Sequence, residues 1–224
     1  MSRVGEVVEL FSKKFSTKPV LAPKLIEQIR SGKDIEEVEF DQVFPQYYQF
    51  QSTIHWSSIS VARQISNWIK PLNRKSVVDI GCGVGKLCLL LRILTNYEIF
   101  GIEQRPNLVE IANKIIRVND FKDISITQMN MLDLNWDLHD IYYLYNPFQE
   151  HIANEDVCLI EKDIEFDTKN YAHYTSEVFR QLTWAKPGKV LITFHGYGGS
   201  VSSEWRMVAS RHIESGDLTM WIKE

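Results

Sequence analysis

The segment "VVDIGCGVGK", residues 77–86, places glycine at alternate positions, Gly81, Gly83 and Gly85, directly after a short apolar run. The residues after Lys86 have helical spacing, so the glycines form the turn between a strand and a helix. Such a turn presents free backbone N–H groups and the positive end of a helix dipole, and glycine lets a ligand approach the backbone. Lys86 stands where a dinucleotide-binding loop has its third glycine, which disfavours the usual pyrophosphate site.

Two carboxylates accompany the glycines. Asp79 precedes them, where it would repel a phosphate but could hold an ammonium group through water or backbone. Glu103 ends the apolar run "EIFGIE", eighteen residues after Gly85, at a position from which a carboxylate binds a ribose diol. A zwitterion that carries a ribose suits this set. A tight strand-to-helix turn without a ligand is the alternative interpretation of the glycines.

At these residues the chain resembles the class I S-adenosylmethionine-dependent methyltransferases, and the resemblance runs from about Trp56 to the C-terminus. It is carried by "VVDIGCGVGK", "FGIEQRP", "ITQMNMLDL" and "YLYNPF". The resemblance implies S-adenosylmethionine as methyl donor and S-adenosylhomocysteine as product. The cofactor-binding residues that it implies are Asp79, Gly81, Cys82, Gly83, Gly85, Glu103, Gln104, Asn130, Met131, Asp133 and Asn146.

Within this set, Asn130 and Met131 would meet the adenine edge. The family usually has an aspartate where Asn130 stands, but an asparagine carbonyl oxygen can also accept a hydrogen bond from the adenine amino group. Asp133 could share that role. Simpler interpretations are that Asn130 is a turn residue and Asp133 a helix cap.

The motif "YLYNPF" supplies three candidate catalytic residues, Asn146, Pro147 and Phe148. In amino-group methyltransferases with an Asn-Pro-Pro-aromatic motif, the Asn side chain and a proline carbonyl accept hydrogen bonds from the nitrogen, and the aromatic ring packs on the substrate. Such acceptors orient the lone pair and stabilise the positive charge that develops during transfer. This chain has one proline rather than two, which loosens the link to planar adenine or glutamine nitrogens, and Asn-Pro is also a common turn.

His195 is the fourth candidate catalytic residue, at the end of a later apolar run in "TFHGYGG". It could deprotonate the nucleophile, although a histidine in this place more often satisfies local hydrogen bonds. His55 and Trp56 could close over the cofactor or form a packed linker. The histidines have no paired ligand spacing and the cysteines do not cluster with them, so no metal site is predicted.

Short apolar runs alternate with amphipathic segments from Lys75 onward, which predicts a parallel sheet with crossover helices. Two apolar runs around "SGD" near the C-terminus are typical of a closing hairpin. Helical spacing of apolar residues, and the frame of Pro23 and Gly32, predict two helices nearer the N-terminus. We therefore expect an α/β fold: a Rossmann-like, seven-stranded, mostly parallel sheet with a C-terminal antiparallel hairpin strand in residues 56–224, and an N-terminal helical cap in residues 1–55 packed on the core.

The chain of 224 residues carries a net charge of −4, which gives no broad cationic field and disfavours tight capture of long DNA or RNA without excluding a local basic patch. Seven carboxylates and two lysines in residues 149–169 would attract a cationic amine over the site, or form a solvated helix face. The chain has no membrane-length apolar run, no leader-like N-terminus and three cysteines without CxxC spacing. These features predict a cytoplasmic protein without a membrane partner.

The predicted function is methyl transfer from S-adenosylmethionine to a nitrogen of a protein or small-molecule amine. An RNA or DNA base is the alternative acceptor, since nucleic acid is not favoured but not excluded. A non-catalytic S-adenosylmethionine-binding partner protein is a further alternative, against which the retained Asn146 and glycines count. The missing third glycine counts against a nicotinamide oxidoreductase.

Overall fold

The computed structural model describes residues 12–152, 160 and 167–224 of the chain. Most of the first predicted helix, and most of the acidic stretch 149–169, lie outside the described residues. In the described part, every helix is too short or too polar to span a membrane.

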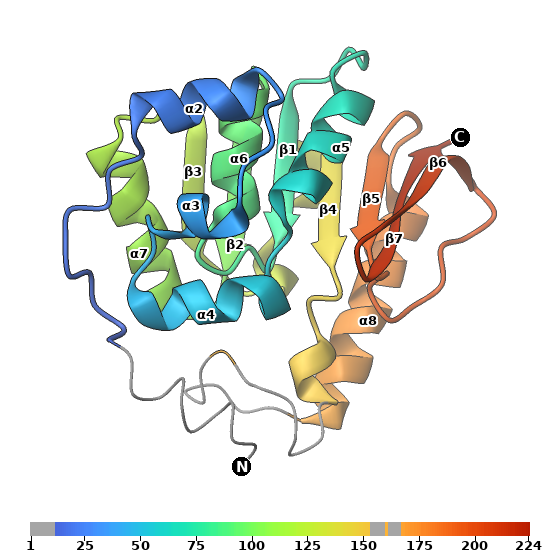
Figure 1. Ribbon diagram of the computed structural model, residues 1–224. Helices are drawn as coiled ribbons and strands as arrows, with labels where there is room; N and C mark the ends of the chain where they lie inside the picture. The colour runs from blue at the N-terminus through green and yellow to red at the C-terminus, as the bar shows by residue number, and fades with distance from the viewer. Residues whose placement is uncertain (1–11, 153–159, 161–166) are drawn as a thin grey trace.

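Seven strands of the described chain form one mixed sheet in the order β3-β2-β1-β4-β5-β7-β6 (Figure 1). The parallel strands are β1 (Ser76–Ile80), β2 (Glu98–Glu103), β3 (Ile124–Gln128), β4 (Ile141–Tyr145) and β5 (Val190–Phe194). The last two strands, β6 (Trp205–Ile213) and β7 (Gly216–Lys223), form a hairpin, and β7 pairs antiparallel with β5. The predicted Rossmann-like sheet with its C-terminal hairpin is confirmed.

The strand order reverses beside β1, because β2 and β3 follow on one side of it and β4 and β5 on the other. Open parallel sheets bind ligands at the carboxyl ends of the strands next to such a reversal. The glycine turn after β1 and the Asn-Pro-Phe turn after β4 both leave the sheet at this point. The topology therefore brings together the two motifs that the sequence singled out.

Helices cover both faces of the sheet (Figure 1). One face carries α5 (Ile59–Ile69), α6 (Lys86–Leu94) and α7 (Pro106–Val118). The other carries α8 (Thr168–Trp184) and the short 3-10 turns η1 (Met131–Asp133), η2 (Trp136–Leu138) and η3 (Gln149–His151). Successive residues of a strand point to opposite faces of the sheet. Val77 therefore belongs to the hydrophobic core on the face that carries α6, and Val78 belongs to the core on the face that carries α8.

The N-terminal helices pack on the face that carries α6 (Figure 1). They are α2 (Pro23–Arg30), α3 (Glu37–Asp41) and α4 (Gln46–His55). Lys86 is the first residue of α6, and its buried Nζ lies 2.6 Å from Glu37, 2.8 Å from Asp41 and 2.6 Å from the Ser52 hydroxyl. Burial raises the pKa of Asp41, and Lys86 opposes that rise. The helix that begins at the glycine turn is thus tied to α3 and α4 by buried charges.

Candidate active site

Two clefts open at the carboxyl edge of the sheet. The Asn130 cleft, named for Asn130 in its wall, has a volume of about 50 Å³, and the Asn146 cleft, named for Asn146, has a volume of about 310 Å³. Gly81, Arg105, Pro147 and Glu150 line both clefts. A ligand longer than either cleft can therefore extend from one to the other past these residues.

The glycines of the turn have positive φ angles, +80° at Gly81, +57° at Gly83 and +76° at Gly85. At Gly83 a Cβ atom would lie 2.4 Å from Nε1 of Trp56, and at Gly85 it would lie 2.4 Å from Cδ1 of Ile126. The second and third glycines thus make room for side chains of this chain. Only Gly81 lies exposed at the junction of the two clefts.

Glu103 is buried, and four donors surround its carboxylate. Arg105 donates to Oε1 from its backbone N at 3.0 Å and from Nε at 2.9 Å. Oε2 accepts from Nη2 of Arg105 at 3.1 Å and from the backbone N of Gly83 at 3.1 Å. Four donors match the four lone pairs of a carboxylate, so a ribose diol can bind Glu103 only when part of this set turns away.

Arg105 is the site residue that the sequence patterns did not indicate. Its guanidinium also donates to Oε2 of Glu150 at 2.7 Å, so one cation joins the ends of β2 and η3. Burial alone would lower the pKa of Arg105, but Glu103 and Glu150 outweigh burial and raise it. The guanidinium stays charged, and Glu150 keeps it paired if Glu103 is given up to a ligand.

Asp79 lies away from both cleft walls. Its carboxyl group is buried on β1, where Sγ of Cys88 donates to Oδ2 at 3.6 Å. Burial raises the pKa of Asp79 to about 7; the bond from Cys88 opposes this rise and the charge of Glu103 adds to it. Cys82, the other buried free thiol, lies with Cys88 against Gly101. Asp79, Cys82 and Cys88 thus support the glycine turn from the buried side, away from the clefts.

On the adenine side, Asn130, Met131 and Gln104 line the Asn130 cleft, whereas Asp133 is exposed outside its wall. Oδ1 of Asn130 caps η1 by accepting from the backbone N of Leu132 at 3.0 Å. Nδ2 of Asn130 donates to the hydroxyl of Tyr174 at 2.8 Å. Asn130 is therefore a turn cap as well as part of the cleft wall.

The Asn-Pro-Phe motif divides between the two clefts. Phe148 is buried in the wall of the Asn130 cleft, where its ring stacks on Tyr174 at 5.2 Å and 18°. Pro147 lies between the clefts, and Asn146 faces the other one. Nδ2 of Asn146 donates to Gln149 at 3.2 Å, and Oδ1 has no bond to a described residue. The carbonyl oxygen of this side chain is free to accept a hydrogen bond.

His195 directly follows β5 and lies beside Asn146. Both residues have positive φ angles, +57° and +38°, and Asn146 N donates to the carbonyl of Gly196 at 3.0 Å. The His195 ring lies parallel to Tyr145, at 5.6 Å and 19°, and Nε2 lies 3.3 Å from the Ser215 hydroxyl. Unfavourable backbone at two adjacent strand ends is typical of functional sites.

Trp56 and His55 also line the Asn146 cleft. The indole N–H of Trp56 is buried next to Gly83 and donates to none of the residues that the structure describes. Among these residues, no group of three histidine, cysteine or carboxylate side chains could hold a metal ion.

Comparison with known families is decisive at this point. A family model for a methyltransferase domain matches residues 72–208, which include the glycine turn, Glu103, Asn146 and His195. The chain belongs to this methyltransferase family. It is an S-adenosylmethionine-dependent methyltransferase, and S-adenosylmethionine is its cofactor.

Solved structures share the fold of this methyltransferase at low sequence identity. An rRNA methylase from Escherichia coli has a TM-score of 0.53 and 11% identity, over 91% of this chain and 78% of that one. A putative methyltransferase, yhhF from Escherichia coli, has a TM-score of 0.52 and 14% identity, over 75% of this chain and 86% of that one. The 23S rRNA (uracil(1939)-C(5))-methyltransferase RlmD of Marinomonas sp. (strain MWYL1) is 29% identical over 68 residues, which are 30% of this chain and only 15% of the relative.

The residues present fit this cofactor. Its methionine moiety carries a carboxylate, for which the unpaired indole N–H of Trp56 beside the glycine turn is a suitable donor. The junction at Gly81 gives a path between the two clefts, and Glu103 can take the ribose in exchange for donors of Arg105. The assignment of individual residues to parts of the cofactor stays a prediction.

Proposed function

We propose that this methyltransferase methylates an uncharged amino nitrogen held by Asn146, and that the acceptor is a nucleobase of RNA. The observation that carries the proposal is the free carbonyl oxygen of Asn146 in the wall of the larger cleft. The bond from Nδ2 to Gln149 occupies the donor of the amide and leaves its acceptor oxygen available to a ligand.

When bound, the cofactor supplies a methyl group activated by positively charged sulfur. The protein has to hold the nitrogen lone pair about 3 Å from that carbon and in line with it. Oδ1 of Asn146 can accept a hydrogen from the amino group and stabilise the positive charge that grows on the nitrogen. The imidazole of His195, exposed and next to Asn146 on the edge, can take the proton that the nitrogen then loses.

The described lining of the Asn146 cleft favours a flat, uncharged acceptor. Tyr145 and His195 present near-parallel rings, and Trp56 also lines the cleft. Glu150 is the carboxylate in the described lining, and its Oε2 already accepts from Arg105. A cationic amine would therefore have to compete with Arg105 for this carboxylate. The rRNA methylases that share the fold, and the rRNA methyltransferase with local sequence similarity, support a nucleobase.

A cationic amine, such as a lysine side chain or a polyamine, is the second candidate acceptor. It is favoured by the local charge of −5 in residues 149–169, most of which lie outside the described part of the chain. The two candidates predict different products, because one places the methyl group in RNA and the other in protein or in small molecules.

The proposal is tested by transfer of labelled methyl groups into cell extract that is then separated into RNA, protein and metabolite fractions. The variant is Asn146→Gly, because glycine adopts the φ of +38° without strain and removes the side chain alone. We expect label in RNA, a fall in turnover of about 100-fold and little change in cofactor affinity. Asn135→Ala, which truncates the cap of η2 at the other edge of the sheet, is the matched control.

Two results would change the assignment. Label confined to protein or metabolites would replace the nucleobase by the second candidate. Wild-type turnover in Asn146→Gly would remove Asn146 from the reaction, whatever the acceptor.

A further inference from the structure

A third cleft lies at the amino edge of the sheet, at the opposite end of the strands from the active site. Its volume is about 740 Å³, and the ends of α5 and α6 and the starts of β1 and β2 surround it. The charged residues that line it are Arg30, Lys70, Arg74 and Arg92. The described lining contains no carboxylate. We call it the arginine cleft.

Helix ends explain why cations gather there. Arg30 ends α2, Lys70 follows the last residue of α5, and Arg92 lies in the last turn of α6. The carboxyl end of a helix carries partial negative charge, which attracts cations. A helix C-terminus is, however, equivalent to only about half a negative charge. The full positive charges of these side chains therefore exceed it, and the cleft keeps a net positive charge.

The bonding of these cations leaves most of that charge uncompensated. Arg92 forms an ion pair with Asp123 at 3.2 Å. Arg30 donates to the carbonyl oxygen of Ile93 at 3.2 Å, and no ion pair joins it to a described residue. The described residues provide no ion-pair partner for Lys70 or Arg74 either.

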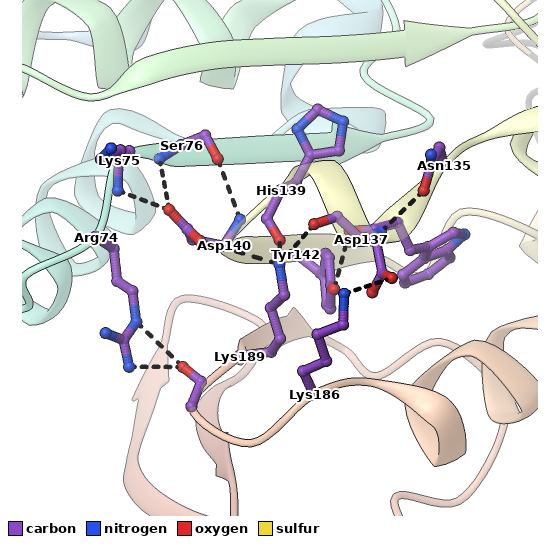
Figure 2. A network of polar contacts seen from close by, with 12 residues as sticks. Arg74, Lys75, Ser76, Asn135, Asp137, His139, Asp140, Tyr142, Lys186 and Lys189 are labelled. Carbon is purple, nitrogen blue, oxygen red and sulfur yellow. Dashed lines mark hydrogen bonds and ion pairs between the residues drawn. The ribbon is translucent and has the colours of Figure 1, made fainter.

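Two carboxylates on the β4 side are already engaged elsewhere, as Figure 2 shows. Asp137 pairs with Lys186 at 2.8 Å, and Asp140 accepts from the backbone N of Lys75 at 2.8 Å and lies 3.9 Å from Lys189. Arg74 turns instead to the carbonyl oxygen of Gly188, at 2.7 Å from Nη2 (Figure 2).

On the α7 side, an adjoining cleft contains two carboxylates, Glu27 and Asp120, and Asp120 is paired with Lys122. Lys70 and Arg74 therefore carry positive charge without an ion-pair partner among the described residues, whereas Arg30 and Arg92 also line the cleft that contains Glu27.

We propose that the arginine cleft binds phosphate groups of an RNA backbone. Guanidinium groups match phosphate oxygens in geometry and charge, and spaced cations suit several phosphates in a row better than one. The aromatic residue of the cleft, Tyr97, is buried and donates its hydroxyl to the carbonyls of Ile69 and Leu72, so it offers no ring for a base to stack on. The contacts would therefore position the RNA without reading its sequence.

The inference rests on the proposed RNA acceptor, but it concerns binding alone. The five residues of β1 separate the cleft from the glycine turn by about 17 Å. An acceptor must therefore extend several nucleotides beyond the methylated base to reach the cleft. Long RNA should then bind more tightly than a short oligonucleotide.

The test is fluorescence anisotropy of a labelled single-stranded RNA of about 20 nucleotides, without cofactor and at several salt concentrations. Four phosphate contacts at about 0.7 each predict that log K falls with log salt at a slope near −3. Lys70→Glu reverses the charge of a side chain that has no ion pair with a described residue. It should weaken RNA binding about tenfold or more and make the slope of log K against log salt shallower by roughly one. Lys169→Glu makes the same charge change at the exposed start of α8 and should bind RNA like the wild type.

Each other result would overturn one of the two assignments, the RNA-binding cleft or the RNA acceptor. Absence of RNA binding, or equal weakening by Lys70→Glu and Lys169→Glu, would show that the cleft is not the RNA site. Displacement of RNA by pyrophosphate at a concentration far below that of the competing salt would assign the cleft to small phosphate compounds. RNA binding that depends on Lys70, without methyl transfer to RNA, would leave the cleft standing and reject the proposed acceptor.

Discussion

Asp79→Asn should change the pH dependence of stability strongly. Asp79 is buried behind the glycine turn, and burial raises the pKa of its carboxyl group from an ordinary value of 3.8 to about 7. The folded protein therefore keeps a proton between these values that the unfolded chain releases. The contribution of Asp79 to the free energy of unfolding is greatest below pH 3.8 and is lost as the pH rises to about 7.

The magnitude follows from the two pKa values. The difference between 3.8 and about 7 corresponds to about 4 kcal/mol, at about 1.4 kcal/mol for each pH unit. About 3 kcal/mol of this change falls between pH 5 and pH 8. Asparagine does not titrate, so Asp79→Asn lacks this contribution at every pH. Relative to the wild type, the variant should gain about 3 kcal/mol across that range.

The measurement is urea unfolding of both proteins at pH 5, 6, 7 and 8, with the difference in unfolding free energy plotted against pH. Titrating groups away from Asp79 contribute equally to both proteins and cancel. Cys88→Ala is the matched control, because it removes the hydrogen bond to Asp79 at the same buried place but keeps the carboxyl group. It should keep the wild-type slope or steepen it, since the thiol bond lowers the pKa of Asp79. Parallel curves for wild type and Asp79→Asn would refute the reasoning.

Two further substitutions test which contacts hold the glycine turn in its conformation. Gly83→Ala places a Cβ atom 2.4 Å from the Trp56 indole, so calorimetric titration should show cofactor binding weakened at least about tenfold. Gly32→Ala is the control, because Gly32 has a φ of +76° and open space around it. This variant incurs backbone strain alone and should bind the cofactor normally. Equal affinities would show that the turn tolerates a side chain. Lys86→Met leaves Asp41 buried without its cation and should lower the free energy of unfolding in urea by about 3 kcal/mol. Adding Asp41→Asn to Lys86→Met should recover part of this loss, and no recovery would mean that the buried charge is not its cause.

The sheet could be predicted from the sequence because each strand is a short apolar run bounded by turn residues. The same pattern located the hairpin around Gly216, whereas the reversal of strand order beside β1 was seen in the structure alone. The positions of Gly81, Asn146 and His195 at one edge follow from that topology, since all three come directly after parallel strands. These predictions needed no side-chain contacts.

The remainder of the site depends on contacts between distant residues, which a sequence pattern does not contain. No sequence pattern indicated Arg105, because its role depends on ion pairs with Glu103 on β2 and Glu150 on η3. Phe148 follows Asn146 by two residues, yet the turn sends its ring into the other cleft, against Tyr174 on α8. His55 and Trp56, by contrast, were indicated by the sequence and do line the Asn146 cleft.

Lys86 connects the two parts of the chain that the sequence separates at residue 55. It stands where a dinucleotide loop has glycine, and its buried ammonium group lies against Glu37 and Asp41 from the predicted N-terminal cap. An ammonium group that is 2% exposed needs these carboxylates, because an unpaired charge in the interior costs several kcal/mol. A chain that began at residue 56 would leave Lys86 without them at the first turn of α6, and it would also lose His55 from the wall of the Asn146 cleft. The boundary stays a prediction, but the glycine turn depends on residues from both sides of it.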